Sequence, residues 1–240
     1  RERCFKSGIV PLQGMSESLI AISNSIKIAK AWRNCFDIKI SQKINNHETK
    51  TMIFSEYESK LILKKYKIPI PKSLITNKND ILRDYKKIGF PLVAKINSNT
   101  IFHKTEIDGV VTNINSEKEL KKKTNKFKNK ILIEKMITDK VFEIIIGIKN
   151  DSQFGPTLII GAGGIYTELF NETTTLLLPL NKKIILEEIK KLKFSKILFG
   201  FRGKKGGDVD SLINIILKLA NFAEKNSNNI SEVDINPLII

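Results

Sequence analysis

Cysteine and histidine are scarce in this sequence of 240 residues, which contains two of each. Cys4 and Cys35 form no CxxC pattern, and their spacing to His47 and His103 fits no zinc finger. Isolated cysteines of this kind are typical of reduced thiols in a cytoplasmic protein. The cysteine and histidine content therefore excludes a zinc finger and favours a cytoplasmic location.

Long hydrophobic runs are also missing. The longest apolar stretch, residues 157–165, contains three glycines and is far shorter than the roughly 18 residues that a membrane-spanning helix needs. Hydrophobic residues nevertheless make up 41% of the chain and charged residues 28%, which is sufficient for a folded core. The sequence indicates one large or two small globular domains and excludes a transmembrane protein.

Arginine is rare, with five among the 41 basic residues, although the net charge is +16. Such a charge first suggests a nucleic-acid partner. The lysines, however, are spread along the whole chain, with the densest run at 118–130, and no RRM, zinc-finger or basic-region pattern accompanies them. We therefore expect a solvated basic surface and no nucleic-acid partner.

Turn and capping signals divide the chain into segments. Residues 1–36 contain a loop and a helix of periodic apolar residues, and the polar, aperiodic stretch 37–53 is an expected linker. Ser55 and Glu58 form a capping-box pattern that opens a helix. The elements that follow it predict two small α+β subdomains, at 54–129 and 130–240.

The two ends of the sequence suggest that it is a part of a longer protein. Since the chain opens at Arg1 without methionine and closes inside an expected strand, we expect a piece of a longer polypeptide.

The expected elements of these subdomains follow from periodicity and from glycine, proline and capping residues. Strands are expected at 73–75, 92–96, 110–114, 131–136, 141–149, 157–161, near 174–178 and from 232, and helices at about 80–88, 183–192 and 210–224, with a further helix capped by Ser116.

One lysine lies in an otherwise apolar strand. Alternation places Lys95 on the strand face that holds Val93 and Asn97. The side chain either extends from a strand edge to solvent or meets an anion, and a compact ammonium can reach between nucleotide phosphates. Lys95 is therefore a candidate phosphate ligand.

The last strand has an oxygen-rich face. Glu232, Asp234 and Asn236 alternate with Val233 and Ile235, so the three polar side chains share one face. Such a face is either an ordinary half-exposed strand or a site for Mg²⁺, which prefers oxygen ligands and bridges to nucleotide phosphates. Asp234 and Asn236 are candidate metal ligands.

Further candidates interrupt apolar segments. Glu134 and Glu143 lie in isoleucine-rich strands and must point to solvent or to a partner. The turn that contains Gly163 and Gly164 either offers backbone N–H groups to phosphate or is simply tight, and it matches neither Walker A nor the Rossmann fingerprint. Arg202 stands where lysine is the usual cation, so it either binds phosphate bidentately or forms a surface salt bridge.

His103 lies in the loop between the Lys95 strand and the next strand. A lone histidine is commonly a bystander. An imidazole can also accept a phosphoryl group and pass it on, and the loop is close in sequence to the candidate phosphate ligand.

Taken in order, these segments resemble the ATP-grasp domain of ADP-forming acyl-CoA synthetases, which include acetate–CoA ligase (ADP-forming) and, more distantly, succinyl-CoA synthetase. The resemblance covers 55–240, while residues 8–32 look like the end of the CoA-ligase domain that precedes ATP-grasp in fused members. The motifs that carry it are Ser-Glu-Tyr-Glu at 55–58, Tyr-Lys-Ile-Pro-Ile-Pro at 66–71, Gly-Phe-Pro-Leu-Val-Ala-Lys at 89–95, His-Lys at 103–104 with Gly-Val at 109–110, Gln-Phe-Gly-Pro at 153–156, Gly-Ala-Gly-Gly-Ile-Tyr at 161–166, Phe-Arg-Gly at 201–203 and Asp-Ile-Asn-Pro-Leu at 234–238.

The resemblance implies an α/β (α+β) ATP-grasp fold, in which two α+β subdomains clasp the nucleotide after a short helical remnant of a CoA-ligase domain. The implied reaction converts acid, CoA and ATP to acyl-CoA, ADP and phosphate through an acyl phosphate and a phosphohistidine. The implied roles are Lys95 on the phosphates, Glu134 and Met136 in the hinge against adenine, Glu143, Gly163 and Gly164 in the nucleotide site, Asp234 and Asn236 on Mg²⁺, His103 in the phosphoryl relay and Arg202 in charge neutralisation.

The implied partners are a CoA-binding domain or subunit with a second histidine, coenzyme A and a small carboxylic acid. Relatives carry a further acidic metal ligand after the Asn-Pro-Leu segment, whereas this sequence ends at Ile240. Two other readings remain open: an ATP-grasp-like regulatory region of a fused protein acyltransferase, and a basic nucleic-acid-binding module.

Overall fold

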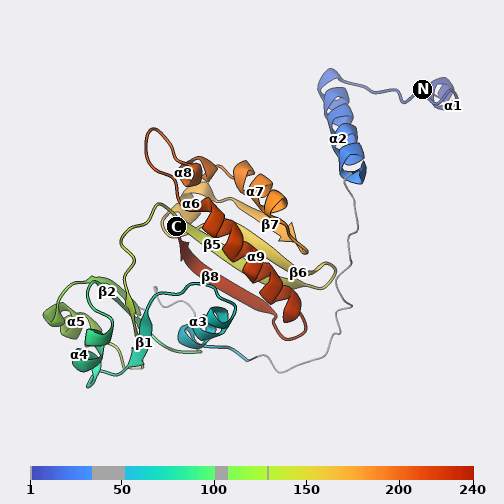
Figure 1. Ribbon diagram of the computed structural model, residues 1–240. Coiled ribbons are helices and arrows are strands. Elements are labelled where there is room, and N and C mark those ends of the chain that lie inside the picture. Colours follow the sequence, from blue (N-terminus) through green and yellow to red (C-terminus); the bar gives the residue numbers. More distant parts are fainter. Residues whose placement is uncertain (1, 34–51, 101–107, 129) are drawn as a thin grey trace. The chain divides into compact units, whose positions relative to one another are not determined.

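The computed structural model describes residues 2–33, 52–100, 108–128 and 130–240, which divide into two units, 1–40 and 41–240 (Figure 1). The first unit contains α1 (Glu2–Lys6) and α2 (Met15–Arg33). The expected N-terminal helix is thereby confirmed. Its apolar side chains Leu19, Ile26 and Trp32 are exposed, and no described residue of this unit buries them.

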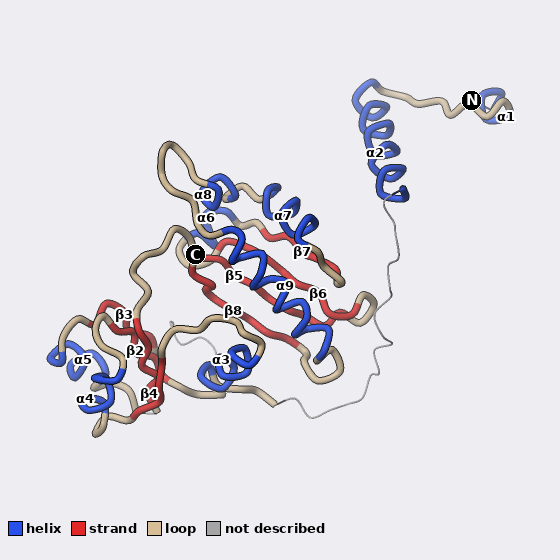
Figure 2. Tube along the Cα trace, in the orientation of Figure 1, coloured by secondary structure: helices blue, strands red, loops and turns tan. Residues whose placement is uncertain are grey.

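The second unit contains two antiparallel sheets of four strands each (Figure 2). The first sheet has the order β1-β4-β2-β3. Its strands are β1 (Ser73–Thr76), β2 (Leu92–Ile96), β3 (Val110–Ile114) and β4 (Ile131–Lys135). One face packs against α4 (Ile81–Asp84) and α5 (Glu117–Thr124), with Leu92, Ala94 and Ile133 in the buried layer. The alternate residues, Lys95 among them, belong to the other face.

The second sheet has the order β7-β6-β5-β8. Its strands are β5 (Glu143–Asp151), β6 (Gly155–Ala162), β7 (Thr173–Leu177) and β8 (Glu232–Ile239). The helices α7 (Lys182–Lys191) and α9 (Val209–Lys225) cover one face, as Figure 1 shows. The residues at this interface include Ile144, Ile146 and Leu158 from the strands and Ile216 and Leu219 from α9. Two short helices, α6 (Tyr166–Phe170) and α8 (Ser195–Phe199), complete this part.

Helix α3 (Glu56–Lys65) belongs to both parts of the second unit. Its capping box is confirmed: the Ser55 hydroxyl accepts a hydrogen bond from the Glu58 N–H, and the Glu58 carboxylate accepts one from the Ser55 N–H (2.8 Å). Near its start, the Tyr57 N–H donates to the Asn97 side chain beside β2 (3.4 Å). At its end, the ring of Tyr66 packs edge-on against Phe222 of α9, with 4.7 Å between the ring centroids.

The structure differs from the expected subdomain boundaries in two places. β4 falls in the expected second subdomain, 130–240, yet it pairs with both β1 and β2. Leu63 of α3 falls in the expected first subdomain, 54–129, yet it is buried in the core of the second sheet. The order of elements along the chain does not reveal a strand that inserts between two earlier ones, or a helix end that packs on a later sheet.

The ends of individual helices and strands differ less from the expected positions than the subdomain boundaries do. The expected helix at 80–88 is split into α4 and a 3-10 turn, η1 (Tyr85–Lys87). The helices α1, α6 and α8 were not expected, because five residues are too few to display a helical period. The other expected strands and helices are present, with ends shifted by at most a few residues.

Candidate functional site

Lys95 lies in the interior of the first sheet. Its strand, β2, is paired with β3 on one side and β4 on the other, which excludes the alternative of a lysine at a strand edge. The side chain is 20% exposed. A lysine in this setting needs an anion nearby, because an unpaired buried ammonium is costly.

Two carboxylates supply that anion. The Lys95 ammonium lies 2.6 Å from Glu56 Oε1 and 2.9 Å from Glu134 Oε2. Lys60 contacts both of the same carboxylates: its Nζ lies 2.8 Å from Glu56 Oε1 and also bonds Glu134 Oε1. The Glu134 side chain is only 4% exposed. We call these four residues the Lys95 cluster.

Local structure explains how the cluster forms. Glu134 faces Val93 in the register of β4 and β2, so it is the diagonal neighbour of Lys95 on the same face of the sheet. Glu56 and Lys60 are four residues apart on α3 and therefore share one face of the helix. The capping box fixes where α3 begins, and this sets the position of Glu56 in the first turn.

The charges in the cluster stabilise one another. Burial alone would raise the pKa of Glu56, but Lys95 and Lys60 outweigh it and hold that pKa well below its usual range. Burial would likewise lower the pKa of Lys95, but Glu56 and Glu134 outweigh it and raise that pKa. Both groups are therefore charged at neutral pH.

This linkage predicts how Glu56→Gln changes stability. A carboxylate whose pKa is lowered by folding stabilises the fold above the pKa of the unfolded state, near 4.5, and loses this contribution as the pH falls below it. We expect the variant to unfold about 1–3 kcal/mol more easily at pH ~7, and the difference to shrink towards pH ~3. Urea unfolding, monitored by circular dichroism at both pH values, measures this difference in the free energy of unfolding. Glu224→Gln, at an exposed position of α9, is the control, and a difference independent of pH would contradict the linkage.

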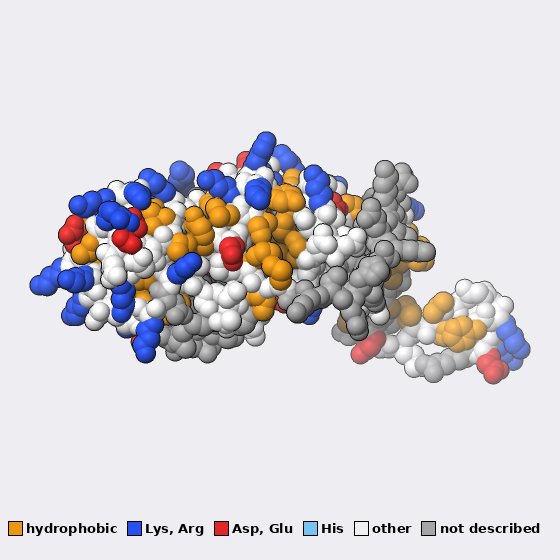
Figure 3. Space-filling view, turned by 90° about the horizontal axis from the view of Figure 1, so that it is seen from below, with side chains coloured by type: hydrophobic (Ala, Val, Ile, Leu, Met, Phe, Trp, Pro, Cys, Tyr) orange, Lys and Arg blue, Asp and Glu red, His pale blue; other side chains and the backbone are white. Residues whose placement is uncertain are grey.

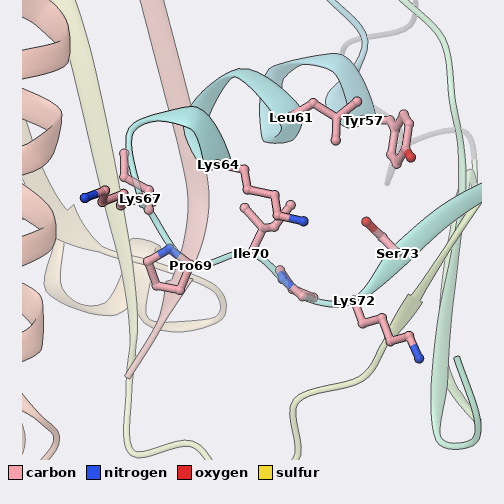
Figure 4. A pocket seen from close by; sticks show the side chains of 10 residues that line it. Tyr57, Leu61, Lys64, Lys67, Pro69, Ile70, Lys72 and Ser73 are labelled. Carbon is pink, nitrogen blue, oxygen red and sulfur yellow. The ribbon is translucent and has the colours of Figure 1, made fainter.

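A cavity of about 550 Å³ opens beside α3. Its lining combines Tyr57 and Leu61 of α3 with the segment from Lys67 to Ser73 (Figure 4). The cavity adjoins the end of β4, since Ser73 pairs with Glu134 and the Lys72 carbonyl accepts a hydrogen bond from the Lys135 N–H (2.8 Å). A cavity lined by both apolar residues and lysines thus borders the segment 134–136.

The oxygen-rich face expected on the last strand is present. Glu232, Asp234 and Asn236 of β8 are exposed, while Val233 and Ile235 are partly buried against the core. Partial burial, and then the charge of Glu232, raises the pKa of Asp234. Among the described residues, no three acidic, histidine or cysteine side chains gather as a metal cluster. The two expected metal ligands nevertheless lie on one strand face and offer the oxygen donors that Mg²⁺ prefers.

Glu143 and the glycine turn lie against each other. The Gly163 N–H donates to the Glu143 carbonyl (2.8 Å), so this N–H serves the sheet and not a phosphate. Gly164 has a φ of +58°, and a Cβ there would collide with the Glu143 carboxylate. The Glu143 side chain also pairs with Lys140 (2.5 Å). The glycines let the chain turn closely over Glu143 at the end of β6.

With this geometry described, the chain can be compared with known proteins. A family model described as ATP-grasp domain matches residues 45–240. The chain belongs to the ATP-grasp family. The match begins in the expected linker and includes α3, both sheets and every candidate residue named above.

Two curated relatives of this ATP-grasp chain are named as ADP-forming CoA ligases. It is 31% identical over 198 residues to the β subunit of acetate–CoA ligase [ADP-forming] II from Pyrococcus furiosus, covering 77% of this chain and 84% of that one. It is 35% identical over 199 residues to 4-hydroxybutyrate–CoA ligase [ADP-forming] from Nitrosopumilus maritimus, covering 77% of this chain but only 28% of that protein. The chain therefore spans nearly the whole of a β subunit and about a quarter of a single-chain ligase.

Solved structures agree with this assignment. Acetyl-coenzyme A synthetase 1 from Ca. Korarchaeum cryptofilum, in complex with coenzyme A and Ca-AMPCP, superposes with a TM-score of 0.72 at 28% identity, covering 88% of this chain and 91% of that one. The same synthetase in complex with coenzyme A and Mg-AMPPCP gives a TM-score of 0.67 at 30% identity, covering 88% and 90%. The expected ATP-grasp fold is confirmed, and the relatives named here include neither a protein acyltransferase nor a nucleic-acid-binding protein.

The remaining candidates of the ATP-grasp site are dispersed. Arg202 and Gly203 form the tip of a tight turn at positive φ. The Arg202 guanidinium lies over the Phe201 ring (5.3 Å to the centroid) and forms no ion pair with another described residue. Met136 follows β4, and its N–H donates to the Pro91 carbonyl (3.0 Å). His103 lies outside the described residues.

The sequence analysis missed Glu56 and Lys60. Their signal is a Glu directly after the N-cap serine and a Lys four residues later, but this pattern alone does not show which strand the helix contacts. On the face that Figure 3 shows, lysine and arginine side chains are interspersed with side chains of other types. None of the described helices is long and apolar enough to cross a membrane.

Proposed function

We propose that this chain is the nucleotide-binding part of an ADP-forming acyl-CoA ligase of the acetate–CoA ligase type. The observation that carries the proposal is the arrangement around α3. Next to this helix a sheltered lysine lies between carboxylates, and a cavity of about 550 Å³, lined in part by the same helix, borders the end of β4. A base can pack on the apolar residues of this cavity, such as Leu61 and Ile70, while phosphates extend to the lysine.

In this proposal the adenine lies in the cavity against the segment that includes Glu134 and Met136. Lys95 binds the phosphates, because an ammonium has three N–H donors and only two are directed at Glu56 and Glu134 among the described residues. Glu143, Gly163 and Gly164 form the wall of the site at the end of β6, and Arg202 adds positive charge near the transferred phosphate. Catalysis by these residues consists of positioning and charge neutralisation.

Asp234 and Asn236 hold Mg²⁺ in this proposal. One carboxylate and one amide oxygen on an exposed strand face suit an ion that keeps several waters and binds nucleotide phosphates. When bound, the ion neutralises phosphate charge during transfer. The related synthetase from Ca. Korarchaeum cryptofilum, which was solved with Mg-AMPPCP, supports this assignment.

The complete reaction needs a partner. We propose that a CoA-binding domain or subunit with a second histidine supplies the coenzyme A and carboxylic acid sites, and that His103 receives the phosphoryl group on the nucleotide side. The β-subunit names of two relatives from Pyrococcus furiosus and the phosphohistidine segment named in the related synthetase support this division. We place the protein in the cytoplasm, where nucleotides and coenzyme A are available.

The test combines binding with activity. Calorimetry of the chain should show that Mg·ATP and Mg·ADP each bind with a stoichiometry of one, at the same site. With its CoA-ligase partner added, acetyl-CoA, ADP and phosphate should yield ATP, whereas the chain alone should yield none, because the CoA and acyl sites are on the partner. Transfer of the acetyl group to protein lysines without ATP formation would contradict the ligase assignment, and the lack of any nucleotide binding would contradict the whole proposal.

A further inference from the structure

Lys135, at the end of β4, is a half-buried lysine to which the proposed function gives no role. Its ammonium donates hydrogen bonds to the Gly89 carbonyl (3.3 Å) and to the Phe90 carbonyl. Hydrogen bonds from a charged donor are stronger than those between neutral groups, and they compensate for the conformational entropy that a fixed lysine side chain loses. Lys135 therefore holds the turn 89–91 to the end of β4.

The side chain of Lys135 belongs to the face of the first sheet that is remote from the proposed phosphate site. Lys135 pairs with Leu92 in the register of β4 and β2, and Leu92 is part of the core beneath α4 and α5. Lys95 and Glu134 project from the opposite face, because successive residues of a strand point to opposite sides. Lys135 can therefore act on a nucleotide only through the backbone that it holds.

The backbone around Lys135 connects the two parts of the proposed nucleotide site. Its N–H donates to the carbonyl of Lys72, which lines the cavity (2.8 Å), and the N–H of Met136 donates to the Pro91 carbonyl (3.0 Å). The turn that ends at Pro91 continues directly into β2, the strand that carries Lys95. Lys135 thus links the wall of the base cavity to the strand of the phosphate ligand.

We propose that Lys135 is a positioning residue that sets the separation between the base cavity and Lys95. A nucleotide that occupies both parts binds well only if this separation matches its own length. A separation that is fixed before binding also lowers the cost of ordering the site. The inference rests on the proposed function, since it assigns a role at the same nucleotide site.

General stabilisation of the first sheet is the competing explanation. In that case Lys135 would only keep β4 and the turn folded, and its loss would weaken every ligand of the site to the same extent. The proposed role concerns only a ligand that occupies both parts at once. Tripolyphosphate carries three linked phosphates without a base, so it needs Lys95 but not the cavity. The two explanations therefore differ in how the affinities for ATP and tripolyphosphate change relative to each other.

The experiment measures binding of Mg·ATP and of Mg·tripolyphosphate by calorimetry for the wild type, Lys135→Met and Lys135→Arg. We expect Lys135→Met to bind Mg·ATP at least tenfold more weakly, about 1.4 kcal/mol, and to bind Mg·tripolyphosphate within about twofold of the wild type. Lys135→Arg keeps charged N–H donors on a long side chain and should bind Mg·ATP within about threefold of the wild type. Lys130→Met, which removes the same charge from an exposed position just before β4, should leave both affinities within about twofold.

Each result decides the question. Equal Mg·ATP binding by the wild type and Lys135→Met, an equal loss for both ligands, or a Lys135→Arg variant as weak as Lys135→Met would overturn the role of Lys135 and leave the nucleotide site in place. Tripolyphosphate that does not bind the wild type would also overturn it, because the phosphates would then not be held independently of the base. Absence of Mg·ATP binding by the wild type would overturn the proposed function and this inference with it. If Lys135→Met does not fold, as judged by circular dichroism, Lys135→Gln takes its place with the same expected and contrary results.

Discussion

The Lys95→Ala variant is expected to bind Mg·ATP at least about 100-fold more weakly than the wild type, a loss of about 2.7 kcal/mol. Two effects combine. The substitution removes the ammonium that would contact the phosphates, and it removes a positive charge beside the carboxylates of Glu56 and Glu134. The site then loses both a hydrogen-bond donor and an attractive charge. Calorimetry with Mg·ATP and Mg·ADP measures the change.

The control for this variant is Lys86→Ala, which removes an exposed lysine from the 3-10 turn beside α4. It should bind nucleotide within about twofold of the wild type, because its charge is solvated. Circular dichroism establishes that Lys95→Ala is folded, with Lys95→Met as a replacement of similar length if it is not. Unchanged affinity in a folded Lys95 variant would place the phosphates elsewhere.

The His103→Ala variant is expected to separate binding from chemistry. A phosphoryl group that moves between a nucleotide site and a distant acyl site must be protected from water, and a histidine can hold it covalently during this transfer. With the CoA-ligase partner present, we expect acyl-CoA formation to fall by at least about three orders of magnitude, while Mg·ATP affinity stays within about threefold. Steady-state kinetics and calorimetry on the same preparation measure the two quantities.

His47→Ala is the matched control, since it removes the other histidine of the chain and lies in the expected linker. It should retain near-normal turnover. Near-normal turnover of His103→Ala would show that the transfer proceeds through the partner's histidine alone. Loss of Mg·ATP binding together with turnover would assign His103 a structural role.

The sequence predicted features that depend on local periodicity. Alternation within five residues placed Lys95 on the correct face of its strand, and the same rule placed Asp234 and Asn236 on the exposed face of β8. The capping box likewise located the start of α3. In each case the information lies within a few neighbouring positions, which makes it readable without the fold.

Features that depend on distant pairing were not predicted. Glu56 and Lys95 are 39 positions apart, and Lys60 and Glu134 are 74 apart, so their contacts appear only once α3 has docked on the sheet. For the same reason, the chain order did not show that β4 enters the first sheet. The resemblance supplied the family and the roles of the candidate ligands, whereas the carboxylate partners of Lys95 became visible only in three dimensions.

The double attachment of α3 also bears on how this protein acquires its structure. Asn226 donates a hydrogen bond to the Tyr66 hydroxyl (2.9 Å) across 160 positions of sequence, and Leu63 completes a core built mostly from residues beyond 140. During synthesis, α3 emerges long before α9. Its apolar end therefore stays unburied until most of the chain has been made. Contacts of such large sequence separation slow folding, because a long loop must close before they are formed. The two sheets are therefore not independent folding units that mature one after the other, since the second core is completed only when the earliest helix of the unit joins it.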